Sequence, residues 1–190
     1  MKVLILVISV LISQLSFCQN FDLNKKEIKR IIEDQQQNLD TIHQLLLVVN
    51  DNDSSHKAVL IAMEKRNHRW KLKFKPMEAS IGKNGFALPG QKQEGDGKSP
   101  TGIFILGRLF SYENKVNTKL LFTQTTEDDK WIDDPDHADY NKYVKGITTA
   151  KSFEHLRLAG IYYKYCMVIE YNTNPILKGK GECHILSSGR

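Results

Sequence analysis

The hydrophobic positions of this 190-residue chain change their spacing along the sequence, and each spacing predicts a different element. After a potential cap at Asn24, apolar positions recur every three or four residues and predict an amphipathic helix over residues 25–40. The positions on its inward face are Ile28, Ile31, Ile32, Gln35 and Leu39. Ser152 is expected to cap a second, short helix that ends at Leu158.

Short apolar runs and two-residue alternation predict strands through most of the remaining chain. The predicted strands cover residues 45–50, 57–64, 70–74, 103–106, 120–124, 163–170 and 182–186. The turn-forming residues from Asp51 to Ser55 join the first two strands as a hairpin.

Two of these strands carry a specific expectation about burial. Trp70, Leu72 and Phe74 alternate with three lysines, which predicts an apolar core face and a basic solvent face. The strand over residues 163–170 is apolar on both faces, which predicts burial on both sides. Its middle residue, Cys166, is then a buried thiol or one half of a disulfide with Cys183.

A glycine-rich stretch separates the two groups of strands. Half of the protein's 12 glycines lie between residues 82 and 102, so we expect a long, shaped loop. Phe86 and Leu88 inside it favour an ordered loop. It closes on Ser99-Pro100-Thr101-Gly102, a typical turn sequence.

Residues 1–18 are typical of a secretory signal peptide, because Lys2 precedes an apolar run and small residues stand at Ser16 and Cys18. We expect cleavage after Cys18 and export to the periplasm or cell envelope. A lipoprotein site at Cys18 is the alternative, which the bulky Phe17 disfavours. The apolar run is too short for a transmembrane helix.

Composition indicates one ordinary globular domain with a formal charge of +5. We find no nucleic-acid-binding motif and expect no nucleic-acid partner. The acidic segment around His137 raises the question of a metal site, but its spacing fits no calcium loop. We therefore expect neither a metal nor another cofactor.

Three motifs, in this order, resemble the L,D-transpeptidase catalytic domain (YkuD-type) family. The sequence from Gly95 to Phe104 is similar to the family segment G-x-x-x-T/S-P-x-G-x-F. The second motif runs from Trp131 to Pro135 and continues at Tyr140-Asn141. The third runs from Ile169 to Asn172 and continues through Pro175 to Gly179-Lys180-Gly181.

The resemblance implies a mainly β (α+β) fold, a mixed-sheet sandwich or barrel that is incomplete at the C-terminus and preceded by a helix. The expected organisation is a signal peptide over 1–18, a helical segment over 19–42 and the L,D-transpeptidase-like domain over 43–190. By resemblance, the substrate groove is formed by Gly97, Lys98, Ser99, Pro100, Thr101, Gly102, Trp131, Asp133, Asp134, Tyr140 and Asn141. The implied function is cross-linking or remodelling of peptidoglycan, with stem peptides as partners of a monomeric protein.

In this family, a cysteine in a Gly-Cys motif attacks a stem-peptide carbonyl and a histidine activates it. No Gly-Cys pair occurs in this sequence, so we expect no catalytic competence in this form. Cys183 and His184 are the remaining candidates, but adjacent strand residues point to opposite faces. A pairing of Cys166 with His155 also stays open.

Two explanations fit the missing motif. The chain is a truncated or frame-shifted copy, as the polar tail Ser187 to Arg190 suggests, or it is a pseudoenzyme that binds wall peptide without cutting it. A non-catalytic binding or interaction module is thus the alternative function.

Overall fold

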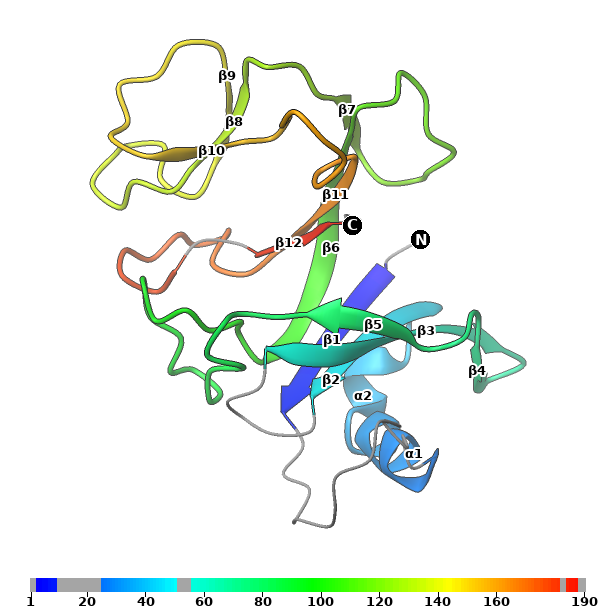
Figure 1. Ribbon diagram of the computed structural model, residues 1–190. Coiled ribbons are helices and arrows are strands. Elements are labelled where there is room, and N and C mark those ends of the chain that lie inside the picture. The colour runs from blue at the N-terminus through cyan, green and yellow to red at the C-terminus, as the bar shows by residue number, and fades with distance from the viewer. Residues whose placement is uncertain (1–2, 10–24, 51–55, 182–183, 188–190) are drawn as a thin grey trace. The chain divides into compact units, whose positions relative to one another are not determined.

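The computed structural model describes residues 3–9, 25–50, 56–181 and 184–187 (Figure 1). These residues form a mainly β protein with three small sheets and two short helices near the N-terminus. The chain divides into two compact units, one made of Met1–Gln91 with Gly97–Ile103 and one of Lys92–Asp96 with Phe104–Arg190. The glycine-rich loop therefore contributes to both units.

The first unit contains the predicted N-terminal helix, which has a break. Helix α1 spans Lys25–Asp34 and helix α2 spans Gln36–Leu39. Ile28, Ile31 and Ile32 pack against a buried apolar cluster that includes Leu39, so the predicted inward face is confirmed. The predicted cap, Asn24, lies outside the described residues.

One sheet belongs to this unit. Its strands are β1 (Val3–Ser9), β2 (Gln44–Asn50), β3 (Lys57–Arg66), β4 (Arg69–Leu72) and β5 (Met77–Ser80). Strands β2 and β3 form the predicted antiparallel hairpin, and the other edge of β3 pairs in succession with β5 and β4. Leu45, Leu47 and Val49 of β2 lie in the core cluster, and Val48 and Asn50 on the other face are buried as well.

Strand β1 lies within the segment that the sequence predicts as a signal peptide. It pairs in parallel with β2, with Val3 opposite Gln44 and Ser9 opposite Asn50. Cleavage after Cys18 would remove this neighbour of β2 from the exported chain. The signal peptide stays a prediction.

The expected core face holds for Trp70 but is wrong for Leu72 and Phe74. Leu72 and Phe74 are 54% and 61% exposed, and only Trp70 packs against the core cluster. The reason is that β4 ends at Leu72 and pairs with the last residues of β3, so no other described element covers the outer part of the alternating stretch. Figure 1 shows β4 at the end of the hairpin that it forms with β3.

The second unit holds the other two sheets. In one sheet, β11 (Tyr165–Ile169) pairs on its two edges with β12 (His184–Ser187) and β6 (Gly102–Ser111), and β7 (Phe122–Gln124) pairs with the end of β6. In the other, β8 (Asp129–Ile132) lies between β9 (Tyr143–Lys145) and β10 (Phe153–His155). Their core contains Phe110, Trp131, Leu156, Cys166 and Val168.

Two predictions about this unit need correction. The helix expected from Ser152 to Leu158 is instead strand β10, which pairs with β8. A helix of that length is costly to nucleate, and pairing with β8 supplies the backbone bonds instead. Strand β11 buries Cys166 and Val168 on one face, but Tyr165 on the other face is exposed, so burial on both sides fails there.

Leu47 in β2 is buried and Phe74 after β4 is exposed, so substitutions at the two positions should differ in their effect on stability. Leu47→Ala, at a fully buried position, should lower the free energy of unfolding by ~2–5 kcal/mol because it leaves a cavity. Phe74→Ala should change it by less than ~0.5 kcal/mol because the ring is largely in solvent. Urea unfolding measures both values, and a large loss for Phe74→Ala would contradict the observed exposure.

Candidate functional site

The second unit brings together three segments that lie far apart in the sequence. The first link is Asn141, which is buried and adopts a positive φ of 59°. Its side-chain oxygen accepts a hydrogen bond from Trp131 Nε1 at 3.1 Å, and its amide nitrogen donates to the carbonyl of Asn172 at 2.6 Å. One side chain therefore joins the end of β8 to the loop that follows β11.

Asn172 makes the second link. Its Oδ1 accepts from the backbone N–H of Leu177 at 2.7 Å. Its Nδ2 donates to the carbonyls of Leu177 and Gly181, at 3.0 and 2.7 Å. Asn172 also has a positive φ, 52°, a conformation that asparagine tolerates better than most residues. The side-chain amide of Asn172 thus ties together the two ends of the loop over residues 172–181.

The third link comes from the glycine-rich loop. Lys92 is 7% exposed, and its ammonium donates to Asp96 Oδ1 at 2.7 Å and to its neighbour's carbonyl, that of Gln93, at 2.6 Å. A Cβ at Gly181 would lie 2.9 Å from Lys92 Nζ, so glycine allows this close approach. The loops are further tied by a bond from Glu94 N–H to Gly179 O at 3.1 Å.

Tyr140 completes this arrangement, because its hydroxyl donates to Glu94 Oε2. We call the whole set the polar junction. It consists of Lys92, Glu94, Asp96, Trp131, Tyr140, Asn141, Asn172 and Gly181.

The acidic segment beside the junction mostly caps backbone groups. Asp134 accepts from the N–H groups of Lys151 and Asp136 at 2.8 and 3.0 Å, and these bonds hold its pKa below the ordinary value. Asp133 differs, because its Oδ1 is buried and accepts no hydrogen bond from the described residues. Within these residues, no group of three or more His, Cys, Asp or Glu side chains is placed to hold a metal ion.

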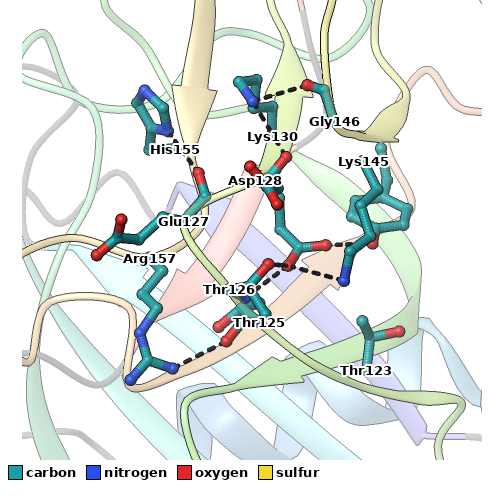
Figure 2. A network of polar contacts seen from close by, with 12 residues as sticks. Thr123, Thr125, Thr126, Glu127, Asp128, Lys130, Lys145, Gly146, His155 and Arg157 are labelled. Atoms are coloured by element: carbon teal, nitrogen blue, oxygen red, sulfur yellow. Dashed lines mark hydrogen bonds and ion pairs between the residues drawn. The ribbon is translucent and has the colours of Figure 1, made fainter.

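A second polar network lies at the start of β8, where Figure 2 shows Thr126, Asp128 and Lys130. Asp129 belongs to this network. The fully buried carboxylate accepts from the N–H and hydroxyl of Thr126, at 2.5 and 2.7 Å, and from the Tyr143 hydroxyl. Around it, Lys130 donates to the carbonyls of Asp128 and Gly146, as the dashed lines in Figure 2 show. This network fixes the turn into β8 and the neighbouring strand β9.

The Asp129 network also shifts two pKa values. Burial alone would raise the pKa of Asp129, but the bonds from Tyr143 and Thr126 and the nearby Lys145 charge together lower it. Burial and the bond to Asp129 raise the pKa of Tyr143 to about 12. The folded state therefore favours an ionised Asp129 beside a neutral Tyr143.

The residues expected to line a substrate groove fall into two groups. Trp131, Asp133, Asp134, Tyr140 and Asn141 lie in the second unit, at or beside the junction. The stretch Gly97, Lys98, Ser99, Pro100, Thr101, Gly102 belongs to the first unit.

In the first unit, this stretch braces the loop. Ser99 Oγ accepts from Gly82 N–H at 3.0 Å, and Thr101 Oγ1 donates to Ala87 O at 2.9 Å. A Cβ at Gly82 would lie 2.5 Å from the carbonyl oxygen of Gly97, so the two backbone segments touch here. Both hydroxyls thus have structural partners, and the order expected of the loop is confirmed.

The thiol candidates are placed as follows. Cys183 lies outside the described residues, and His184 begins β12, opposite Ile169. Cys166 is a free, fully buried thiol whose pKa burial raises to about 12. Since the thiolate is the nucleophile, Cys166 is unsuited to attack, and the pairing with the exposed His155 loses its basis.

Sequence reasoning missed three members of the junction, Lys92, Glu94 and Asp96, as interacting side chains. Asp96 four residues after Lys92 is a weak signal of an ion pair, and outside a helix it predicts no contact. No local pattern reveals that Lys92 is buried, because lysine is almost always exposed.

Comparison with known protein families, curated proteins and solved structures finds no match to this chain. Among the described residues, no helix combines the length and the apolar character needed to cross a membrane.

Replacing Asn172 should separate its two structural roles. Asn172→Ala loses the bonds to Leu177 and Gly181 and puts at positive φ a residue that tolerates this conformation less well than asparagine, which together should cost ~2–3 kcal/mol of stability. Asn172→Gly loses only the bonds and should cost about half as much. Urea unfolding, with hydrogen exchange of the Leu177 amide, measures this. Wild-type exchange at Leu177 in both variants would contradict the assigned bond.

The lowered pKa of Asp129 predicts an acid-sensitive fold. The ionised group contributes its full stabilisation above the ordinary pKa of 3.8, and this contribution is lost as the pH falls through the lowered folded value. Asp129→Asn should cost ~1–3 kcal/mol at neutral pH and flatten the acid limb of stability against pH. The exposed Asp128→Asn is the matched control, and an identical acid limb in both variants would refute the assignment.

Proposed function

We propose that this chain is an exported L,D-transpeptidase-family protein that binds peptidoglycan stem peptides at the polar junction, without transpeptidase chemistry in this form. The family's mixed-sheet fold is part of the proposal. The three sequence motifs that resemble the family support it, together with the contacts that two of these motifs make.

The observation that carries the proposal is the Asn141–Asn172 link. The second and third motifs meet at this contact, although its two residues lie 31 positions apart in the sequence. Asn141, which donates the bond, and Asn172, which accepts it, both have a strained backbone with positive φ. Residues in sparsely populated conformations cluster at binding sites, because the surrounding structure must hold them there. Asp96 of the first motif, and Glu94 just before that motif, belong to the same set of contacts.

Asp133, which follows β8 beside the junction, has a group that suits a peptide. A buried carboxylate oxygen without a partner is costly, and a ligand N–H or ammonium would satisfy it. Stem peptides offer both kinds of donor, in their backbone amides and in a free amine. The neighbouring Asp134 uses both of its oxygens on backbone N–H groups, so Asp133 is the better placed acceptor.

The chemistry supports binding over cutting. Acyl transfer needs an accessible thiolate within reach of a base, and Cys166 is buried with a raised pKa. The competing function is a cross-linking or remodelling enzyme that uses Cys183 with His184. A carbapenem separates the two, since it acylates a reactive cysteine and leaves a mass increase that Cys183→Ser abolishes.

We expect the purified protein to bind isolated sacculi and a soluble stem tetrapeptide without a carbapenem adduct. Asp133→Asn should weaken tetrapeptide binding about tenfold, because the amide is a poorer acceptor for a charged donor. Asp136→Asn, which changes an exposed carboxylate nearby, should change it less than twofold. Calorimetry measures both.

Two results would count against this function. Equal binding by both variants would remove Asp133 from the site. An adduct on Cys183 would favour the enzyme instead of the binder.

A further inference from the structure

The first unit contains a groove that neither the motifs nor the proposed function uses. It has a volume of about 720 Å³ and lies between helices α1 and α2 on one side and the β3–β4 hairpin on the other. That volume is within the range of small-molecule sites in proteins, ~300–1,000 Å³. Its lining residues lie between Ile28 and Leu72, so the groove is built by residues outside the predicted signal peptide.

The floor and walls of the groove are apolar. Leu39 and Met63 are buried beneath it, and Ile28 and Ile32 of α1 face Trp70 and Leu72 of β4 across it. Leu72 is 54% exposed, so its side chain is open to a ligand. An elongated apolar body would bury surface against both walls.

The charges at the groove favour an anion. The lining contains three basic side chains, Lys29, Lys65 and Arg69, and two acidic ones, Glu33 and Asp40. His68 also lines the groove. Lys29 pairs with Glu33 at 3.5 Å, and Lys65 donates to the carbonyls at the end of α2. Arg69 has no ion-pair partner among the described residues, so its guanidinium is available to a ligand.

The position of Arg69 is well defined. It is the first residue of β4, directly after the two-residue turn Asn67-His68, whose φ values of 49° and 61° fit a type I′ hairpin. The backbone pairing of Arg69 with Arg66 fixes it at the start of the strand. A guanidinium suits a carboxylate, which it can bind through two parallel N–H bonds.

From this combination we propose that the groove binds an amphiphilic carboxylate of the medium-chain fatty-acid type. The apolar chain lies between α1 and β4, and the carboxylate meets Arg69. The inference is independent of the proposed function, because every lining residue belongs to the first unit.

The probe is dodecanoate below its micellar concentration, titrated into the purified protein by calorimetry, with the Trp70 indole N–H as a local reporter in NMR. Arg69→Gln should weaken binding about tenfold. Lys71→Gln removes the same charge from the same strand without touching the groove and should change affinity less than twofold.

The apolar wall is tested in the same way. Leu72→Ser should weaken dodecanoate binding about fivefold, and Phe74→Ser, which alters an exposed residue outside the groove, should leave it unchanged. Since both side chains are largely exposed, neither variant should impair folding.

Dodecanol, which has the same chain without the charge, should bind at least tenfold more weakly than dodecanoate. Equal affinities for the two probes, or a loss with Lys71→Gln as large as with Arg69→Gln, would overturn the proposal. Binding to phosphatidylglycerol vesicles without binding to monomeric dodecanoate would also overturn it, in favour of a membrane surface.

Discussion

The second unit depends on the hydrogen bond from Asn141 to the carbonyl of Asn172. This bond of 2.6 Å joins two loops that no sheet pairing connects. Buried backbone groups in loops must find partners, and side-chain amides are well suited because one group both donates and accepts. Asn141 and Asn172 each do so while holding a positive φ, so the loop conformations and the contact stabilise one another.

The same device recurs at three other turns in the described part of the chain. Asp129 binds the backbone of Thr126, Asp134 binds that of Lys151, and Ser99 binds that of Gly82. In each case a short polar side chain accepts a hydrogen bond from a backbone N–H group of a loop. A binding site on loops needs such support, because a ligand gains little from groups that must first be ordered.

The sequence predicts well the features that depend on local periodicity. The β2–β3 hairpin, the inward face of α1 and the buried Cys166 all follow from apolar spacing. The prediction fails where tertiary cover decides the result. Phe74 continues the alternation but is 61% exposed, and Phe153 joins a strand because β8 is available to pair.

The junction was harder to predict than the strands. Its residues occur in the motifs, but their contacts cross from Glu94 to Tyr140 and from Asn141 to Asn172, distances that no local pattern encodes. A buried lysine such as Lys92 has no signal of its own, because its burial depends on Asp96 and on the absence of a side chain at Gly181. Long-range polar contacts require the fold before they can be recognised.

Recognition and bond cleavage are separable in such an architecture. The groups that hold the junction act on backbone N–H and C=O groups, and none of these contacts requires a nucleophile to be in place. The buried oxygen of Asp133 gains a partner whenever a ligand supplies a donor, whether or not a thiolate stands nearby. In the function that we propose, recognition therefore depends on the loops and their polar contacts, and it does not depend on a reactive thiol.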